Sequence, residues 1–178
     1  MLKHWKQLSS KIVFQNPWWT YKLDQFQIDG GITGEYNYVH TNGACMIIPV
    51  TDNGKIIMVN QYRYLCDKES VEFPCGGVKQ GMSYEAMAHL ELEEETGFRS
   101  TNLSPVAEFN PYNGVTNEIC TVFVARNLVK TTSVPDVTEE FELLYYTPDE
   151  IDTCIGKKMI WDGMTLAAWM LVRKIIER

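Results

Sequence analysis

The segment from Gly76 to Phe98, GGVKQGMSYEAMAHLELEEETGF, constrains the fold more than any other part of the chain. It begins with a glycine-rich stretch and continues into a run that suits a helix, with Ser83 at the N-cap and Gly97 just past the end. The residues just before it, EFPC, are typical of the end of a strand. We therefore predict a strand end, a loop, a capped helix and a second loop in succession.

Glutamates crowd the second half of this predicted helix, at positions 91, 93, 94 and 95. Residues three or four apart share a helix face, so Glu91, Glu94 and Glu95 project together whereas Glu93 points elsewhere. Like charges at this spacing repel by roughly 0.2–0.5 kcal/mol per pair, which an exposed face tolerates. The cluster becomes favourable around a hard divalent cation, since such ions prefer oxygen ligands. An acidic run alone more often forms a solvated face, but the glycine-rich loop before it and the EETGF ending favour a metal site.

Several other segments have the patterns of strands. EYNYVH, residues 35–40, alternates at period two, and QNPWWTYKLDQFQIDGGITGEYNYVH as a whole predicts short strands with a turn at Gly30–Gly31. GACMIIPV and KIIMVNQYRY predict two strands joined in a hairpin, with Asn53–Gly54 as the turn. SPVAEF, EICTVFVARNL and FELLYY are further predicted strands.

Two more helices are indicated by their capping residues. TPDEIDTCI has Thr147 at the cap, Pro148 at the first helical position and Glu150 in the capping-box position. DGMTLAAWMLVRKIIER follows Asp162 as the cap and carries Lys and Arg in its last turn, where the helix dipole favours them. Because strands come first and the helices are few and interleaved, we predict an α/β (α+β) fold in which helices sandwich one sheet.

Length, charge and cysteine content restrict the classes of function. The chain has 178 residues, enough for one domain with a substantial core. Its net charge of -7 argues against nucleic acid or an anionic membrane as a partner, because both attract a basic face. The five cysteines are an odd number without a CxxC pair, and the first residues lack the apolar core of a secretory signal. We therefore expect a reducing, cytoplasmic compartment.

The segment from Gly76 to Phe98 resembles the signature of the Nudix family of pyrophosphate hydrolases. In that signature Gly is followed after five residues by Glu, and after seven more by Arg-Glu-apolar-x-Glu-Glu-x-Gly-apolar; here Gly76 opens it and ELEEETGF closes it. Two positions depart, since Met82 stands at the first Glu and Leu90 at the Arg. Likeness to the ADP-ribose pyrophosphatase branch extends over about residues 17–175 and includes NQYRY, VEFPCGG, FNPYNGVTNE, TPDEI and WDGMTLAAWMLV.

This resemblance implies an αβα sandwich around a mixed central sheet, with the signature forming a loop, helix and loop. It implies that Glu91, Glu94, Glu95 and the backbone carbonyl of Cys75 hold Mg²⁺ or Mn²⁺. Glu91 and Glu95 would then be catalytic as well, because ions held there polarise a diphosphate and lower the pKa of a bound water.

A carboxylate from a later loop often acts as the general base in this branch. Glu139 and Glu140, in DVTEEFELL, both fit that position, and the sequence does not choose between them. Either one is equally well explained as a simple loop charge.

The two departures replace a charged pair with two apolar residues. Losing one member of such a pair would leave a poorly compensated charge, whereas replacing both with hydrophobic residues can preserve stability. Catalysis is more sensitive, because a ligand misplaced by about 1 Å can cost on the order of 10²-fold in rate. Glu85 is a substitute carboxylate only at a position displaced by three residues. The alternative function is therefore a degenerate Nudix-fold module that binds a nucleotide or a protein without efficient turnover.

Four residues are candidates for substrate binding. Arg63 in NQYRY suits a phosphate, which guanidinium binds with two hydrogen bonds, or else forms a structural ion pair. Glu72 in VEFPCGG resembles a position that borders the ligand site, or is a strand charge that faces solvent. Trp18 would stack on a nucleobase or be buried at an interface. Asn113 lies in the FNPYNGVTNE loop.

The expected partner is a small molecule containing a nucleoside diphosphate, ADP-ribose or a similar nucleotide sugar above all. The resemblance also implies that residues 1–40 form an antiparallel strand pair that joins two copies in a homodimer. Residues 41–178 would then form the Nudix domain.

Overall fold

The computed structural model of the chain describes residues 2–131 and 141–176. Their contacts divide the chain into two compact units. Unit 1 comprises Met1–Asn42 and Asn110–Ile119, and unit 2 comprises Gly43–Phe109 and Cys120–Arg178. The predicted metal-binding glutamates all belong to unit 2.

Unit 2 is built on two sheets. The first is four-stranded and mixed, because β4 and β9 run parallel while the other neighbours are antiparallel. Its order is β7 (Cys75–Gly77), β4 (Ala44–Pro49), β9 (Cys120–Lys130) and β8 (Phe98–Phe109). The second is antiparallel, in the order β10 (Glu142–Tyr146), β5 (Ile56–Arg63) and β6 (Lys68–Glu72), with the 3₁₀ turn η1 (Tyr64–Cys66) between β5 and β6.

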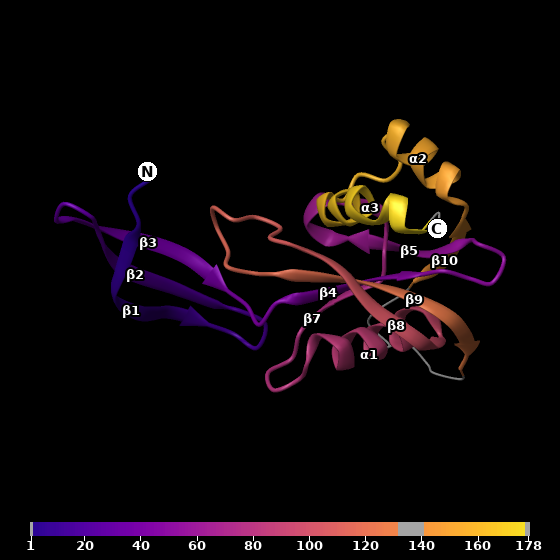
Figure 1. Cartoon of the computed structure of the whole chain (residues 1–178), viewed down its shortest axis with the longest axis horizontal. Coiled ribbons are helices and arrows are strands. Elements are labelled where there is room, and N and C mark those ends of the chain that lie inside the picture. The colour runs from indigo at the N-terminus through magenta and orange to yellow at the C-terminus, as the bar shows by residue number, and fades with distance from the viewer. Residues whose placement is uncertain (1, 132–140, 177–178) are drawn as a thin grey trace. The chain divides into compact units, whose positions relative to one another are not determined.

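Helices cover both faces of the mixed sheet (Figure 1). They are α1 (Tyr84–Thr96), α2 (Pro148–Gly156) and α3 (Gly163–Ile176). Every residue of β4 is buried, and side chains alternate between the two faces of a strand. Cys45 and Ile47 therefore pack with α1, whereas Met46 and Ile48 pack in the core that includes α2 and α3. The predicted αβα sandwich with a mixed sheet is confirmed.

The predicted helix caps are present. The Ser83 side chain accepts a hydrogen bond from the backbone N–H of Ala86 at 3.1 Å, and Gly97 ends α1 in the left-handed region with φ of 71°. Thr147 and Glu150 form the reciprocal capping box of α2. Asp162 accepts from the Thr165 N–H at 2.7 Å at the start of α3. These local signals mark where each helix begins and where α1 ends.

The hairpin predicted from Asn53–Gly54 is only partly correct. The turn forms, since the Thr51 N–H donates to the Lys55 carbonyl at 2.8 Å. Beyond a single bridge between Val50 and Ile56, β4 and β5 belong to different sheets. The two strands part because each pairs with segments far away in the sequence, and a turn signal carries no information about those partners.

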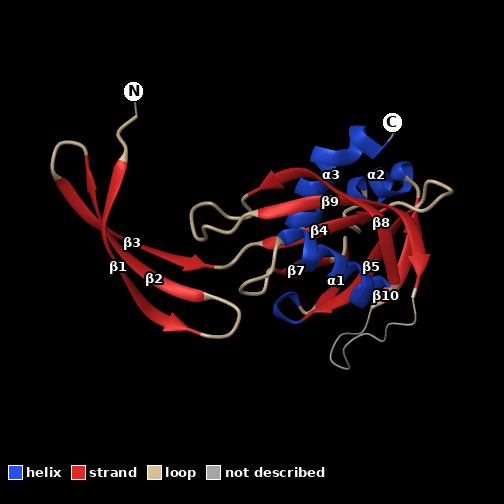
Figure 2. Cartoon of the chain, turned by 60° about the horizontal axis from the view of Figure 1, so that its bottom comes forward, coloured by secondary structure: helices blue, strands red, loops and turns tan. Residues whose placement is uncertain are grey.

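Unit 1 contains a three-stranded antiparallel sheet rather than the expected pair of strands (Figure 2). Its order is β1 (Trp5–Gln15), β2 (Thr20–Ile28) and β3 (Ile32–His40). The rings of Trp5 and Phe26 stack with centroids 4.2 Å apart. Phe26 also lies over Gly34, where an added Cβ would be only 2.6 Å from the ring, so the glycine makes room for it.

The segment 110–119 joins unit 1 through β3. The Val39 N–H donates to the Val115 carbonyl at 2.8 Å, and the Tyr36 hydroxyl donates to the Gly114 carbonyl at 3.0 Å. Among the described residues of unit 1, none is buried. Several of its large apolar side chains, among them Trp5, Ile12 and Phe14, are exposed.

Among the residues that the structure describes, no helix is long and apolar enough to cross a membrane.

We expect Leu92→Ala to lower the free energy of unfolding by about 2–5 kcal/mol, because Leu92 is fully buried between α1 and the mixed sheet and its truncation leaves a cavity. Leu65→Ala is the matched control, since Leu65 is 94% exposed and should change stability by less than about 0.5 kcal/mol. Urea denaturation of both variants measures the difference. Equal losses would contradict the assignment of Leu92 to the core.

Candidate functional site

Helix α1 brings Glu91 into direct contact with β7. A Cβ built on Gly76 would lie 2.0 Å from Oε1 of Glu91, so the carboxylate occupies space that only glycine leaves open. Gly76 is fixed in turn by its pairing with Cys45 of the central strand β4. The close approach of this carboxylate to backbone explains why glycine is needed at the start of the motif.

Glu95 is held on the same strand by a hydrogen bond. It is only 7% exposed, and its Oε2 accepts from the backbone N–H of Cys75 at 3.2 Å. Glu91 and Glu95 therefore gather on the Cys75–Gly76 segment, one turn apart on α1. Glu94 is half-buried on the same helix.

Glu93 has a different role from its neighbours. Its Oε2 accepts from Nε of Arg99 at 2.6 Å, and this hydrogen bond lowers the pKa of the Glu93 carboxyl. The side chain is thus directed away from β7, as the helical spacing predicts.

A thiol lies beneath the carboxylates. Cys45 is fully buried, and burial, with the negative charge of Glu91 as a further cause, raises its pKa to about 12. At neutral pH it is an uncharged thiol and adds no anion to the site. Cys75 has its thiol beside Cys120, and this contact together with burial raises the pKa of Cys75 well above its usual value.

The two departures from the signature are absorbed by packing. Met82 and Leu90 are both partly buried against the core cluster between α1 and the mixed sheet. Glu85, the displaced carboxylate, is exposed in the first turn of α1. Neither position 82 nor position 90 therefore places a charge in the core. Glu91 still lies against Gly76, and Glu95 still accepts the hydrogen bond from the Cys75 N–H. We call these two contact positions the seats of Glu91 and Glu95 on β7.

The donor set fits a hard divalent cation. Carboxylate oxygens are the preferred ligands of Mg²⁺, which usually keeps several waters and needs only one or two protein carboxylates plus substrate phosphates. Glu91 and Glu95, whose carboxylates lie against Gly76 and Cys75, are two such protein ligands. Within residues 2–131 and 141–176, no group of three His, Cys, Asp or Glu side chains is arranged to hold a metal ion by itself. A complete ligand shell would therefore draw on backbone carbonyl, water or phosphate oxygens.

Arg63 and Glu72 contact each other through two parallel hydrogen bonds. Nε of Arg63 donates to Oε1 of Glu72 at 2.8 Å, and Nη2 donates to Oε2. Glu72 is 3% exposed, whereas the Arg63 side chain is 45% exposed. The hydrogen bonds to Glu72 raise the pKa of Arg63. The structural ion pair considered for Arg63 is thus formed, and Glu72 is not a solvent-facing strand charge.

Trp18 and Asn113 both belong to unit 1. Trp18 is 78% exposed, and its backbone N–H donates to Oδ1 of Asn16 at 2.9 Å. Asn113 lines a cavity of about 470 Å³. The other residues lining it are Tyr36, Tyr38, Asn110, Val115, Thr116 and Asn117. Glu139 and Glu140, predicted as alternative general bases, lie outside the described residues.

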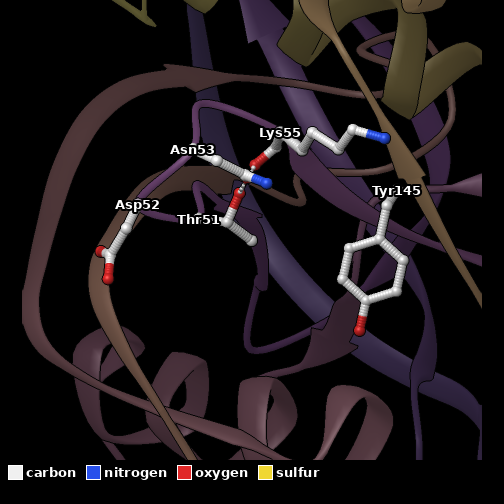
Figure 3. A pocket seen from close by; sticks show the side chains of 5 residues that line it. All are labelled: Thr51, Asp52, Asn53, Lys55 and Tyr145. Carbon is white, nitrogen blue, oxygen red and sulfur yellow. Dashed lines mark hydrogen bonds between the residues drawn. The ribbon is translucent and has the colours of Figure 1, made fainter.

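A second cavity, of about 650 Å³, lies at the turn between β4 and β5 (Figure 3). It is lined by Thr51, Asp52, Asn53, Lys55 and Tyr145. None of the site residues predicted from the sequence lines it, although Asn53 of the predicted turn does.

Sequence reasoning overlooked Tyr84 and Gly43. A Cβ on Gly43 would lie 2.0 Å from the Tyr84 hydroxyl oxygen, so the two residues are in intimate contact. Tyr84 precedes Glu91 by seven positions and therefore shares its helix face. That spacing was available in the sequence, but the contact with Gly43 was not.

Comparison with known proteins gives consistent results. The NUDIX domain model matches residues 40–164. A methanol dehydrogenase activator of Bacillus methanolicus is 30% identical over 165 residues, covering 92% of this chain and 89% of that protein. An ADP-ribose pyrophosphatase of Bacillus subtilis strain 168 is 30% identical over 148 residues, covering 82% and 80%. A crystal structure of an ADP compounds hydrolase superposes with a TM-score of 0.85 at 20% identity, covering 99% of this chain and 96% of that one.

We expect Arg63→Ala to lower the free energy of unfolding by about 3 kcal/mol, because it strips two hydrogen bonds from a carboxylate that stays buried. Arg99→Ala removes a comparable arginine–glutamate pair at a more exposed position and should cost much less. Urea denaturation without substrate measures both. If the two variants are equally stable, Arg63 does not serve to compensate Glu72.

Proposed function

The chain belongs to the NUDIX domain family, and we propose that it hydrolyses the diphosphate of a nucleoside diphosphate linked to another moiety. ADP-ribose or a similar nucleotide sugar is the proposed substrate, which the ADP-ribose pyrophosphatase from Bacillus subtilis supports. The observation that carries the proposal is that two carboxylates of α1, those of Glu91 and Glu95, lie against the backbone of Cys75 and Gly76. Hydrolysis of a diphosphate needs cations beside the bridge, and carboxylates gathered on backbone are suited to hold them.

Nudix hydrolases generally need a divalent metal ion. In this chain Glu91, Glu94, Glu95 and the Cys75 carbonyl would hold Mg²⁺ or Mn²⁺. Such an ion, when bound, polarises phosphoryl oxygens and lowers the pKa of a water ligand. The hydrogen bond from the Cys75 N–H to Glu95 keeps that carboxylate in place before substrate arrives. Placement in advance matters, because reorganising a ligand during the reaction adds to the barrier.

Three of the residues named from the sequence remain our proposals for contacts with a substrate. Arg63, with its guanidinium oriented by Glu72 and half exposed, would bind a substrate phosphate. Trp18 offers an exposed ring for a nucleobase, and Asn113 offers an amide. Glu139 or Glu140 stays our proposal for the general base.

The degenerate module is less well supported than the hydrolase. Its basis was the loss of the charged pair at positions 82 and 90. Met82 and Leu90 are partly buried against the core, and with them in place Glu91 still lies against Gly76 and Glu95 still accepts the hydrogen bond from Cys75. A module that only binds a nucleotide or a protein would have no need for two carboxylates of α1 held against β7.

Incubation with ADP-ribose and related nucleotide sugars in the presence of Mg²⁺ or Mn²⁺ should release AMP. Glu91→Gln and Glu95→Gln should each reduce the rate by at least about 100-fold, because an amide is a weaker ligand and disturbs the seat on β7. Glu93→Gln is the control on the same helix, since Glu93 pairs with Arg99 instead. Chromatography of the products measures all three. Binding without turnover across the panel would favour the module.

We also propose that the protein is a cytoplasmic homodimer. All five cysteines are free, in keeping with a reducing compartment. Unit 1 has no buried residue among those described, although it exposes Trp5, Ile12 and Phe14 on β1. A three-stranded sheet without a covered apolar face is marginal in water, and a second copy of the chain would supply that cover.

The wild-type protein should sediment at twice the chain mass of 20.5 kDa. Ile12→Glu should shift it toward 20.5 kDa, because a charge on β1 would be desolvated at the interface. Met170→Glu, at an 81% exposed position of α3, should leave the mass unchanged. Analytical ultracentrifugation makes the comparison. A wild-type chain that sediments as a monomer would refute this proposal.

A further inference from the structure

The first turn of α1 contributes a polar group to the face that carries the carboxylates. Tyr84, Ala88, Glu91 and Glu95 are spaced by four, three and four residues, so they lie along one side of the helix. Ala88 is fully buried, which brings this side of α1 close to the sheet. Tyr84 itself is partly buried and packs against the same core cluster.

The Tyr84 hydroxyl has a seat at Gly43 like that of Glu91 at Gly76. An added Cβ on Gly43 would lie 2.0 Å from the hydroxyl oxygen and 2.6 Å from the ring carbon that bears it. Gly43 has φ of 101°, a conformation that other residues rarely adopt. Replacing this glycine would therefore both strain the backbone and expel the phenol.

The two glycines lie at the same end of the β4–β7 pair. The Gly43 carbonyl accepts from the Val78 N–H at 2.9 Å, and Gly76 pairs with Cys45 two residues further along. Cys45 and Val78 both pack in the cluster on the α1 side, so this is the face that α1 covers. Helix α1 thus contacts both glycines of this strand pair, with the Tyr84 phenol at Gly43 and the Glu91 carboxylate at Gly76.

Two well-separated close contacts restrict both sliding and rotation of a helix on a sheet, because tightly packed surfaces leave little room for movement. In the family signature an arginine helps orient the neighbouring glutamates, but Leu90 stands at that position here and packs into the core. We propose that Tyr84 is a positioning residue that takes over this role, holding α1 so that Glu91 reaches its seat on Gly76. The inference rests on the proposed function for its catalytic consequence, but its structural consequence can be measured separately.

The test compares Tyr84→Phe with Tyr64→Phe. Tyr84→Phe removes the oxygen that lies at Gly43 and keeps the packed ring, whereas Tyr64 is 82% exposed on the turn between β5 and β6. Isothermal titration with Mn²⁺ alone should give a dissociation constant raised about 10-fold for Tyr84→Phe, as for outer-shell partners of metal ligands. Its kcat on ADP-ribose should fall about 10- to 100-fold with a smaller change in KM, because orientation and not substrate affinity is lost. Tyr64→Phe should match wild type in each measurement.

Thermal unfolding separates positioning from a general loss of structure. Tyr84→Phe should melt close to wild type while its Mn²⁺ affinity falls; Gly43→Ala, which expels the phenol, should weaken Mn²⁺ binding as well. Wild-type affinity and kcat in Tyr84→Phe would overturn the inference, and so would a wild-type chain that binds no Mn²⁺. If wild type binds Mn²⁺ but hydrolyses no substrate, the proposed function fails, and the Mn²⁺ affinity of Tyr84→Phe still decides the role of Tyr84.

Discussion

The positions of Glu91 and Glu95 in unit 2 depend on the contact between α1 and the Cys75–Gly76 strand. Glu91 can rest on β7 only because Gly76 has no side chain, and Glu95 is fixed there by a backbone N–H. Both contacts require α1 to lie close to the mixed sheet, which the burial of Ala88 and Leu92 makes possible. The apolar packing that stabilises the fold is therefore also what brings the carboxylates to backbone.

In α1, close packing of the helix against the sheet takes the place of a charged arginine in orienting the glutamates. A guanidinium among glutamates attracts them at a distance, but it must itself be desolvated and paired. With Leu90 and Met82 in the core, α1 avoids that cost, and the position of Glu91 depends on how accurately the helix docks. The close contacts of α1 with Gly43 and Gly76 favour accurate docking, because a closely packed helix can slide little along the sheet. The same dependence makes the site sensitive to small changes in backbone at positions 43 and 76.

Local patterns in the sequence were sufficient for the helices and for the shared helix face of Glu91 and Glu95, but not for contacts between distant segments. Ser83, Thr147 and Asp162 act within three residues of themselves, so their caps could be predicted. Strand β1 has little alternation in burial and was missed. The bidentate contact of Arg63 with Glu72 and that of Tyr84 with Gly43 depend on sheet register and helix docking, which no short pattern encodes.

The two units of the chain differ in how far their described residues are buried. Unit 2 has a closed core and carries the carboxylates that would hold cations beside any diphosphate. A diphosphate is common to many nucleotides, so these residues alone cannot discriminate between them. Trp18 and Asn113 belong to unit 1, in which none of the described side chains is buried. Exposed positions tolerate substitution better than a packed core, so the sequence of unit 1 can change without disturbing the contact of Glu91 with Gly76 in unit 2.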